Sequence, residues 1–120
     1  MAKHYKQFKL DPYTCWLRVY IDRDAFEKFA GEATEGMGAA TFRDNGLFAV
    51  FIPADESGCV NIRLAAHEAY HVADFLLEHV WMEYKHNSGN EHVAYLVGHV
   101  CERIVEAAKA LTKQRKDSEA

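Results

Sequence analysis

The stretch His67-Glu68-Ala69-Tyr70-His71 decides how the rest of the chain is interpreted. Two histidines four residues apart lie roughly 40° from each other around a helix and one turn along it, so both imidazoles can reach one ion. Glu68 projects beside the pair, where it can act on a water molecule bound to the metal. The stretch therefore predicts a helix that carries two metal ligands, His67 and His71, and a general base, Glu68.

A catalytic zinc ion takes three protein ligands and keeps its fourth position for water. Glu91 is the candidate third ligand, because it follows His71 at a separation that leaves room for one loop and a return to a second helix. A second interpretation of the same residue stays open. Ser88 to Glu91 also has the form of a capping box, with Ser88 as N-cap and Glu91 at N3, which needs no metal.

Composition narrows the class of protein. The 120 residues predict a single domain spanning 1–120, and the formal net charge of −4 gives no general attraction for nucleic acid or an anionic membrane. We expect no signal peptide after Met1 and no membrane span, because no apolar run approaches the roughly 20 residues that a span needs. Three widely spaced cysteines favour reduced thiols and a cytoplasmic location.

Periodicity predicts an α+β fold in the order β-α-β-β-α-α. Asn45-Gly46 between two apolar runs predicts a hairpin with a type I′ turn, in which both central residues have positive φ. Asn61 is the expected N-cap of the histidine helix. The expected elements are a strand over Tyr13–Ile21, a helix over about 24–34, hairpin arms over Ala39–Asp44 and Leu47–Ile52, a helix from Asn61 to about Trp81 and a helix over about 90–113. We expect residues 1–12 and 113–120 to be flexible.

Residues 47–105 resemble the HExxH zinc metallopeptidases of the gluzincin kind, in which the third ligand is a Glu on the following helix, often within an Asn-Glu pair such as Asn90-Glu91. The wording after Asn90 is also similar to small regulatory metallopeptidases of the IrrE/ImmA type and to short zincin-like proteins of bacteriophages. The resemblance implies zinc as cofactor, with His67, His71 and Glu91 as its ligands and Glu68 as base.

The resemblance also implies a minimal zincin fold. This is a small mixed or antiparallel sheet with a β-hairpin, packed on the HExxH helix and on a C-terminal third-ligand helix, and its edge strand binds substrate as an added strand. Typical gluzincins carry an Asp, four residues after the ligand Glu, that orients one histidine; this chain has Tyr95 there. Asp74 or Glu102 could take that role. The candidates for stabilising a transition state are Tyr70, Tyr95 and His99.

Two functions of different classes follow. The first is a zinc-dependent peptidase or related amide hydrolase with a protein or peptide substrate, in which a metal-bound water attacks the amide and Glu68 accepts its proton. The alternative is a catalytically weak or inactive zincin-like binding protein of the phage or prophage type, with a structural metal site. A deformylase with Cys59 as ligand is a weaker interpretation, because the Gly-rich motif of those enzymes is absent. The sequence makes no prediction of oligomeric state.

Overall fold

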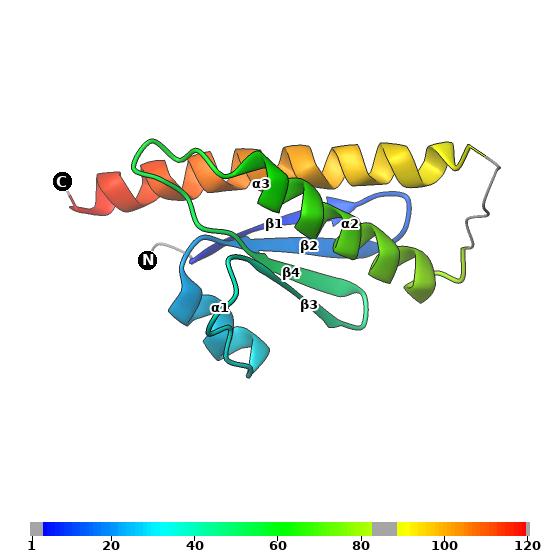
Figure 1. Cartoon of the computed structure of the whole chain (residues 1–120), viewed down its shortest axis with the longest axis horizontal. Coiled ribbons are helices and arrows are strands. Elements are labelled where there is room, and N and C mark those ends of the chain that lie inside the picture. The colour runs from blue at the N-terminus through cyan, green and yellow to red at the C-terminus, as the bar shows by residue number, and fades with distance from the viewer. Residues whose placement is uncertain (1–3, 83–88, 120) are drawn as a thin grey trace.

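The computed structural model describes residues 4–82 and 89–119. Within them the chain is an α+β fold with a four-stranded mixed sheet and three helices (Figure 1). In chain order the elements are β1 (Tyr5–Leu10), β2 (Cys15–Tyr20), α1 (Arg23–Ala30), β3 (Ala40–Asp44), β4 (Leu47–Phe51), α2 (Ile62–His79) and α3 (Glu91–Glu119). The α+β class is therefore as predicted. Of the two sheet types expected, mixed or antiparallel, the structure has the mixed one, with one strand more than expected.

The sheet has the strand order β1-β2-β4-β3. Its central pair, β2 and β4, is parallel, and each outer strand is antiparallel to its neighbour. Helices α2 and α3 cover one face and α1 covers the other (Figure 1). Successive side chains of β4 therefore enter different cores, because strand residues alternate between faces. Phe48 and Val50 pack with α2 and α3, whereas Ala49 and Phe51 pack with α1.

The hairpin between β3 and β4 has the two-residue loop Asn45-Gly46, as predicted. The predicted turn type is wrong, because only Asn45 of the two has a positive φ, at 54°. A type I′ turn needs positive φ at both positions. Gly46 instead aligns its carbonyl with the neighbouring strand, where it accepts a hydrogen bond from the backbone N–H of Trp16 at 2.8 Å.

Helix α2 begins as predicted at its N-cap, Asn61, whose side chain accepts hydrogen bonds from the backbone N–H groups of Arg63 and Leu64. Its buried stripe contains small residues that let α3 lie close against it. The buried residues of α2 are Ala65, Glu68, Ala69, Val72, Ala73, Leu76 and Leu77. Glu68 is the one ionisable side chain among these buried residues, which makes it a candidate functional residue.

The two chain ends are more regular than expected. Residues 1–12 were predicted to be flexible, but Tyr5–Leu10 pairs with β2 along its length and Leu10 is buried. This strand was not predicted, because the sequence of an edge strand is mostly polar. The final helix was expected to fray after Lys113, but α3 continues to Glu119, since lysine, glutamine and arginine are good helix formers.

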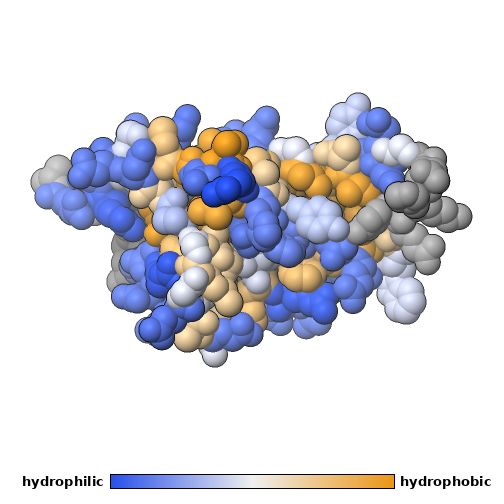
Figure 2. Space-filling model, in the orientation of Figure 1, coloured by the Kyte–Doolittle hydropathy of each residue, from blue (hydrophilic) through white to orange (hydrophobic). Residues whose placement is uncertain are grey.

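The face that carries α2 and α3 is mostly hydrophilic. Figure 2 shows hydrophobic residues gathered chiefly along the line where these two helices lie side by side. In the part of the chain that the structure describes, no helix combines the length and the apolar character that crossing a membrane requires.

Candidate functional site

The two histidines of the HExxH stretch lie on the outer side of α2 and face each other. Their Nε2 atoms are 3.1 Å apart, and their ring centroids are separated by 4.7 Å with a 77° angle between the planes. The ring of Phe75 stacks against His71 at a centroid distance of 6.1 Å. The helix thus brings both ring nitrogens to one point beside the sheet, as the four-residue spacing predicts.

Glu68 lies next to His67 and is only 5% exposed. Its Oε1 accepts a hydrogen bond from the hydroxyl of Thr41 at 2.8 Å, and its Oε2 lies 4.0 Å from Nε2 of His67. The two carboxylate oxygens therefore have different surroundings. One is held by the sheet, and the other faces the histidines.

Thr41 is a site residue that sequence reasoning missed. It stands opposite Val50 in the hairpin, so its side chain points to the face of the sheet that α2 covers. The next residue on that face is Arg43, which bonds Glu78 at 3.0 Å and lies over the ring of Phe75. Strand alternation counted from the Asn-Gly turn could have placed Thr41 toward the helix, but the sequence does not say which α2 residue meets it.

The free edge of β3 runs beside this cluster. Because the carbonyl of Gly46 bonds to Trp16, the even-numbered residues of β4 direct their backbone groups to β2 and the odd-numbered ones direct theirs to β3. The pairs across β3 then leave Thr41 and Arg43 with their N–H and C=O pointing away from β4. Among the described residues no strand lies beyond β3, so these groups are open to an added strand.

A pocket of about 320 Å³ opens where β3 begins. Its lining includes His67, Glu68 and His71 from α2, together with the start of β3 and the segment that joins it to α1. The candidate general base and both candidate ligands therefore share one pocket with the free strand edge.

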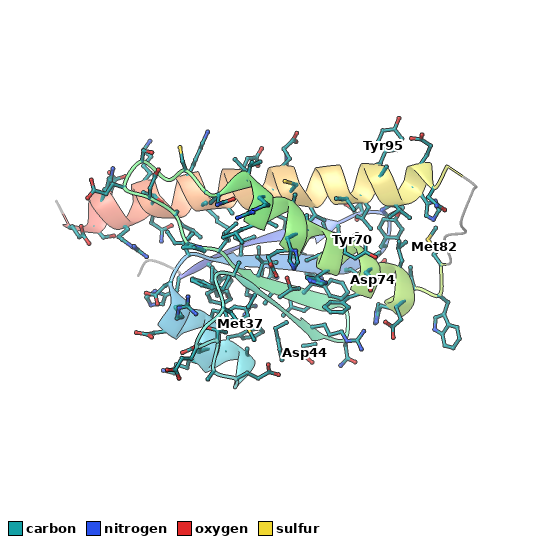
Figure 3. All side chains as sticks on the ribbon, in the orientation of Figure 1. Met37, Asp44, Tyr70, Asp74, Met82 and Tyr95 are labelled. Carbon is teal, nitrogen blue, oxygen red and sulfur yellow. The ribbon has the colours of Figure 1, made fainter. Side chains whose placement is uncertain are left out.

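Two of the proposed auxiliary residues lie near the pair. Tyr70 is adjacent to His71, with ring centroids 6.0 Å apart, and Asp74 follows on the next turn of α2 (Figure 3). Tyr95 lies on α3, is 77% exposed and points away from α2 (Figure 3), and His99 is also exposed. Neither Tyr95 nor His99 lines the pocket that contains the histidine pair.

Glu91 is not brought to the pair either. It is the first residue of α3, and that end of α3 lies at the same end of the molecule as the last turn of α2 (Figure 1). His71 lies about 12 Å back along the axis of α2, at 1.5 Å of rise per residue. Among residues 4–82 and 89–119, no three His, Cys, Asp or Glu side chains form a group that could hold a metal ion.

The alternative interpretation of Glu91, as part of a capping box with Ser88, also changes. Asn90 occupies the N-cap position, because its carbonyl accepts hydrogen bonds from the N–H groups of Val93 and Ala94. Glu91 is then at N1 and not at the N3 position that a capping box needs, while Ser88 lies outside the described residues. Glu102, a candidate for orienting a histidine, is paired with Arg103.

The donor chemistry of the pair suits zinc. Two imidazole nitrogens bound to a tetrahedral zinc ion at 2.0–2.1 Å lie roughly 3.3 Å apart, close to the separation seen here. The pair therefore fits as two ligands, and the third ligand is not assigned by the geometry. No protein-family model, curated protein or solved structure matches this chain.

Proposed function

We propose that the protein is a zinc-dependent hydrolase of peptide or related amide bonds, with a minimal zincin architecture. His67 and His71 are two ligands of the ion and Glu68 is the general base. The observation that supports this most is the 3.1 Å separation of the two Nε2 atoms, together with the buried Glu68, whose Oε2 lies 4.0 Å from Nε2 of His67. Glu91 is a candidate third ligand on the resemblance to gluzincins alone, because this structure does not bring it to the pair.

Each residue has a defined task in the proposed reaction. When bound, zinc supplies Lewis acidity, which polarises an amide carbonyl and lowers the pKa of water. Glu68 accepts the proton of the attacking water through Oε2, the oxygen that faces His67, and then passes it to the leaving amine. Thr41 holds Oε1 and so keeps the other oxygen turned toward the histidines.

The free edge of β3 would bind the substrate backbone. The outward N–H and C=O groups of Thr41 and Arg43 can pair with an extended peptide, which would run past the pocket that contains Glu68. A peptide bound in this way gains its affinity from backbone groups that every sequence has. Selectivity must then come from the side-chain pocket.

The test compares zinc-loaded wild type with Glu68→Gln and with Glu78→Gln as the matched control on the same helix. With a mixture of quenched fluorescent peptides, we expect Glu68→Gln to lose at least about a hundredfold in turnover and to keep its zinc, since general-base catalysis contributes about that much. Glu78→Gln should keep both properties, because Glu78 bonds Arg43 at the surface. Unchanged turnover in Glu68→Gln would refute the proposal.

A second variant examines the third ligand. If Glu91 completes the site, Glu91→Ala will lose most of the bound zinc, whereas Glu91→Ala will keep it if another oxygen donor completes the site. Elemental analysis of the purified variant separates the two outcomes. Neither outcome changes the proposed roles of His67 and His71 as zinc ligands.

One observation favours a different class of function. A spacing of 3.1 Å also suits an N–H···N hydrogen bond between two neutral imidazoles, and the described residues gather two candidate ligands and not three. The chain would then be a zincin-shaped binding or regulatory protein. In that case Glu68→Gln would leave its biological effect intact, and chelation would at most lower its melting temperature.

A further inference from the structure

The pocket beside the histidines has a wall that regular secondary structure does not provide. The segment 31–39 between α1 and β3 forms this wall with Glu32, Ala33, Thr34, Met37 and Ala39. The other lining side chains include three aromatic ones, Phe26, Phe42 and Phe75. At about 320 Å³ the pocket is at the lower end of the volumes of small-ligand sites, which suits a single long side chain.

Three side chains fix this wall in place. Thr34 is 3% exposed, and both its backbone N–H and its hydroxyl donate to the carboxylate of Glu27. Arg23 donates to the carbonyl and hydroxyl oxygens of Thr34, both at 2.7 Å, and to the carbonyl of Met37 at 2.8 Å. The wall is therefore held at Thr34 and Met37, and the exposed Glu32 lies two residues before Thr34.

Besides Glu68, the carboxylate that lines the pocket is Glu32. Among the described residues Glu32 takes part in no hydrogen bond or ion pair. The two nearby cations are engaged elsewhere, Arg23 with the wall and Arg43 with Glu78. Glu68 is already bonded by Thr41. A pocket with aromatic sides and one unpaired carboxylate suits a side chain with an apolar stem and a cationic head.

We propose that this pocket binds a lysine or arginine side chain of the peptide substrate, with the stem against the aromatic rings and the charged group at Glu32. This inference rests on the proposed hydrolase function, and it adds the class of substrate: peptides with a basic residue next to the bond that is cleaved. It gives the segment between α1 and β3 the role of setting specificity.

The test measures how tightly four hydroxamates bind to the zinc-loaded protein. Each hydroxamate chelates zinc and presents one side chain. The four are made from Nα-acetyl-lysine, Nα-acetyl-norleucine, Nα-acetylglutamate and N-acetylglycine, so the lysine compound keeps its charged side-chain amine. Norleucine has nearly the length of lysine without its charge. We expect the lysine compound to bind about fivefold more tightly than the norleucine compound, since an exposed ion pair contributes about that much at most. The glycine and glutamate compounds should bind more weakly than both.

Glu32→Gln is the diagnostic variant and Glu35→Gln is its matched control, because Glu35 lies on the same segment but does not line the pocket. We expect Glu32→Gln to lower the preference for lysine over norleucine by about threefold, with zinc content unchanged, and Glu35→Gln to keep that preference. The inference is overturned if both variants behave alike, or if Glu32→Gln loses its zinc, which would make Glu32 a metal ligand.

The outcomes separate this inference from the proposed function. If all four hydroxamates bind the wild type equally well, the zinc site stands and the specificity pocket is wrong. If the protein holds no zinc and binds none of them, the hydrolase proposal fails and this inference fails with it.

Discussion

The two edges of the sheet differ in chemistry. The outer strand at one edge, β1, carries two exposed lysines, Lys6 and Lys9, on opposite faces. The outer strand at the other edge, β3, is uncharged from Ala40 to Phe42. Its first charged side chain, Arg43, is paired with Glu78. Lysines on an edge strand discourage the addition of another strand, because the pairing would bury their charges.

The open edge is also the one that lies beside the candidate site. Thr41 of β3 bonds the buried Glu68, and the histidine pair shares a pocket with the first residues of that strand. No such cluster accompanies β1 among the described residues. The lysines of β1 thus disfavour an added strand at that edge. The edge at β3 lacks such charges from Ala40 to Phe42, and a peptide bound there would lie next to Glu68.

The largest effect on this comparison should come from Thr41, since it joins the open edge to Glu68, the proposed general base. Thr41→Val removes the hydroxyl and keeps the shape, so Glu68 loses the bond that orients it. We expect kcat to fall about tenfold with little change in zinc content, because a hydrogen bond to a charged group contributes about that much. Thr41→Ser should restore most of the rate. A kcat that is the same in all three proteins would remove Thr41 from the mechanism.

Proline substitutions compare the two edges directly. Gln7 in β1 and Arg43 in β3 both direct their backbone N–H away from the sheet, so proline at either removes a free donor and no ladder hydrogen bond. We expect Arg43→Pro to raise KM for the peptide mixture about fivefold, the loss expected for one backbone hydrogen bond, and Gln7→Pro to leave KM unchanged.

Arg43→Ala is the control for the lost side chain, because Arg43 also bonds Glu78. It should raise KM less than Arg43→Pro does. Equal changes in KM for Arg43→Pro and Gln7→Pro, with both proteins folded by thermal melting, would mean that the two edges do not differ in binding peptide.

The smallest expected effect is on thermal stability. It concerns the bonds between Glu27 and Thr34 that hold the pocket wall, and how their contribution changes with pH. The backbone N–H of Thr34, and then its hydroxyl, hold the pKa of Glu27 below its ordinary 4.5. A carboxylate with a depressed pKa stabilises the fold above its ordinary pKa and loses that contribution as the pH falls through the lowered value. The melting temperature of wild type should therefore slightly exceed that of Glu27→Gln at pH 7, with a smaller difference at pH 3. A difference that is the same at both pH values would contradict this role for Glu27.

Local patterns predicted the elements around the site well. The Asn45-Gly46 loop, the cap at Asn61 and the four-residue spacing of the histidines each depend on near neighbours in the sequence, and the structure has all three. The polar strand β1 was missed because its pairing with β2, and not its own hydrophobicity, makes it a strand. Periodicity cannot detect a contribution of that kind.

The long-range parts of the site could not be predicted in the same way. Spacing along the chain permits Glu91 to reach the pair, but the direction and start of α3 decide whether it does, and these depend on packing between helices. Thr41 and Glu32 come to the pocket from segments far from the HExxH stretch. Their participation depends on how the hairpin and the segment after α1 lie against α2.

The most direct measurement is the zinc content of the purified protein by elemental analysis, for wild type, His71→Ala and the exposed-histidine control His99→Ala. We expect about one zinc ion per chain in wild type and in His99→Ala, and a loss of most of it in His71→Ala. Wild type that binds no zinc, or His71→Ala that keeps as much as wild type, would contradict the claim that the histidine pair on α2 binds the metal.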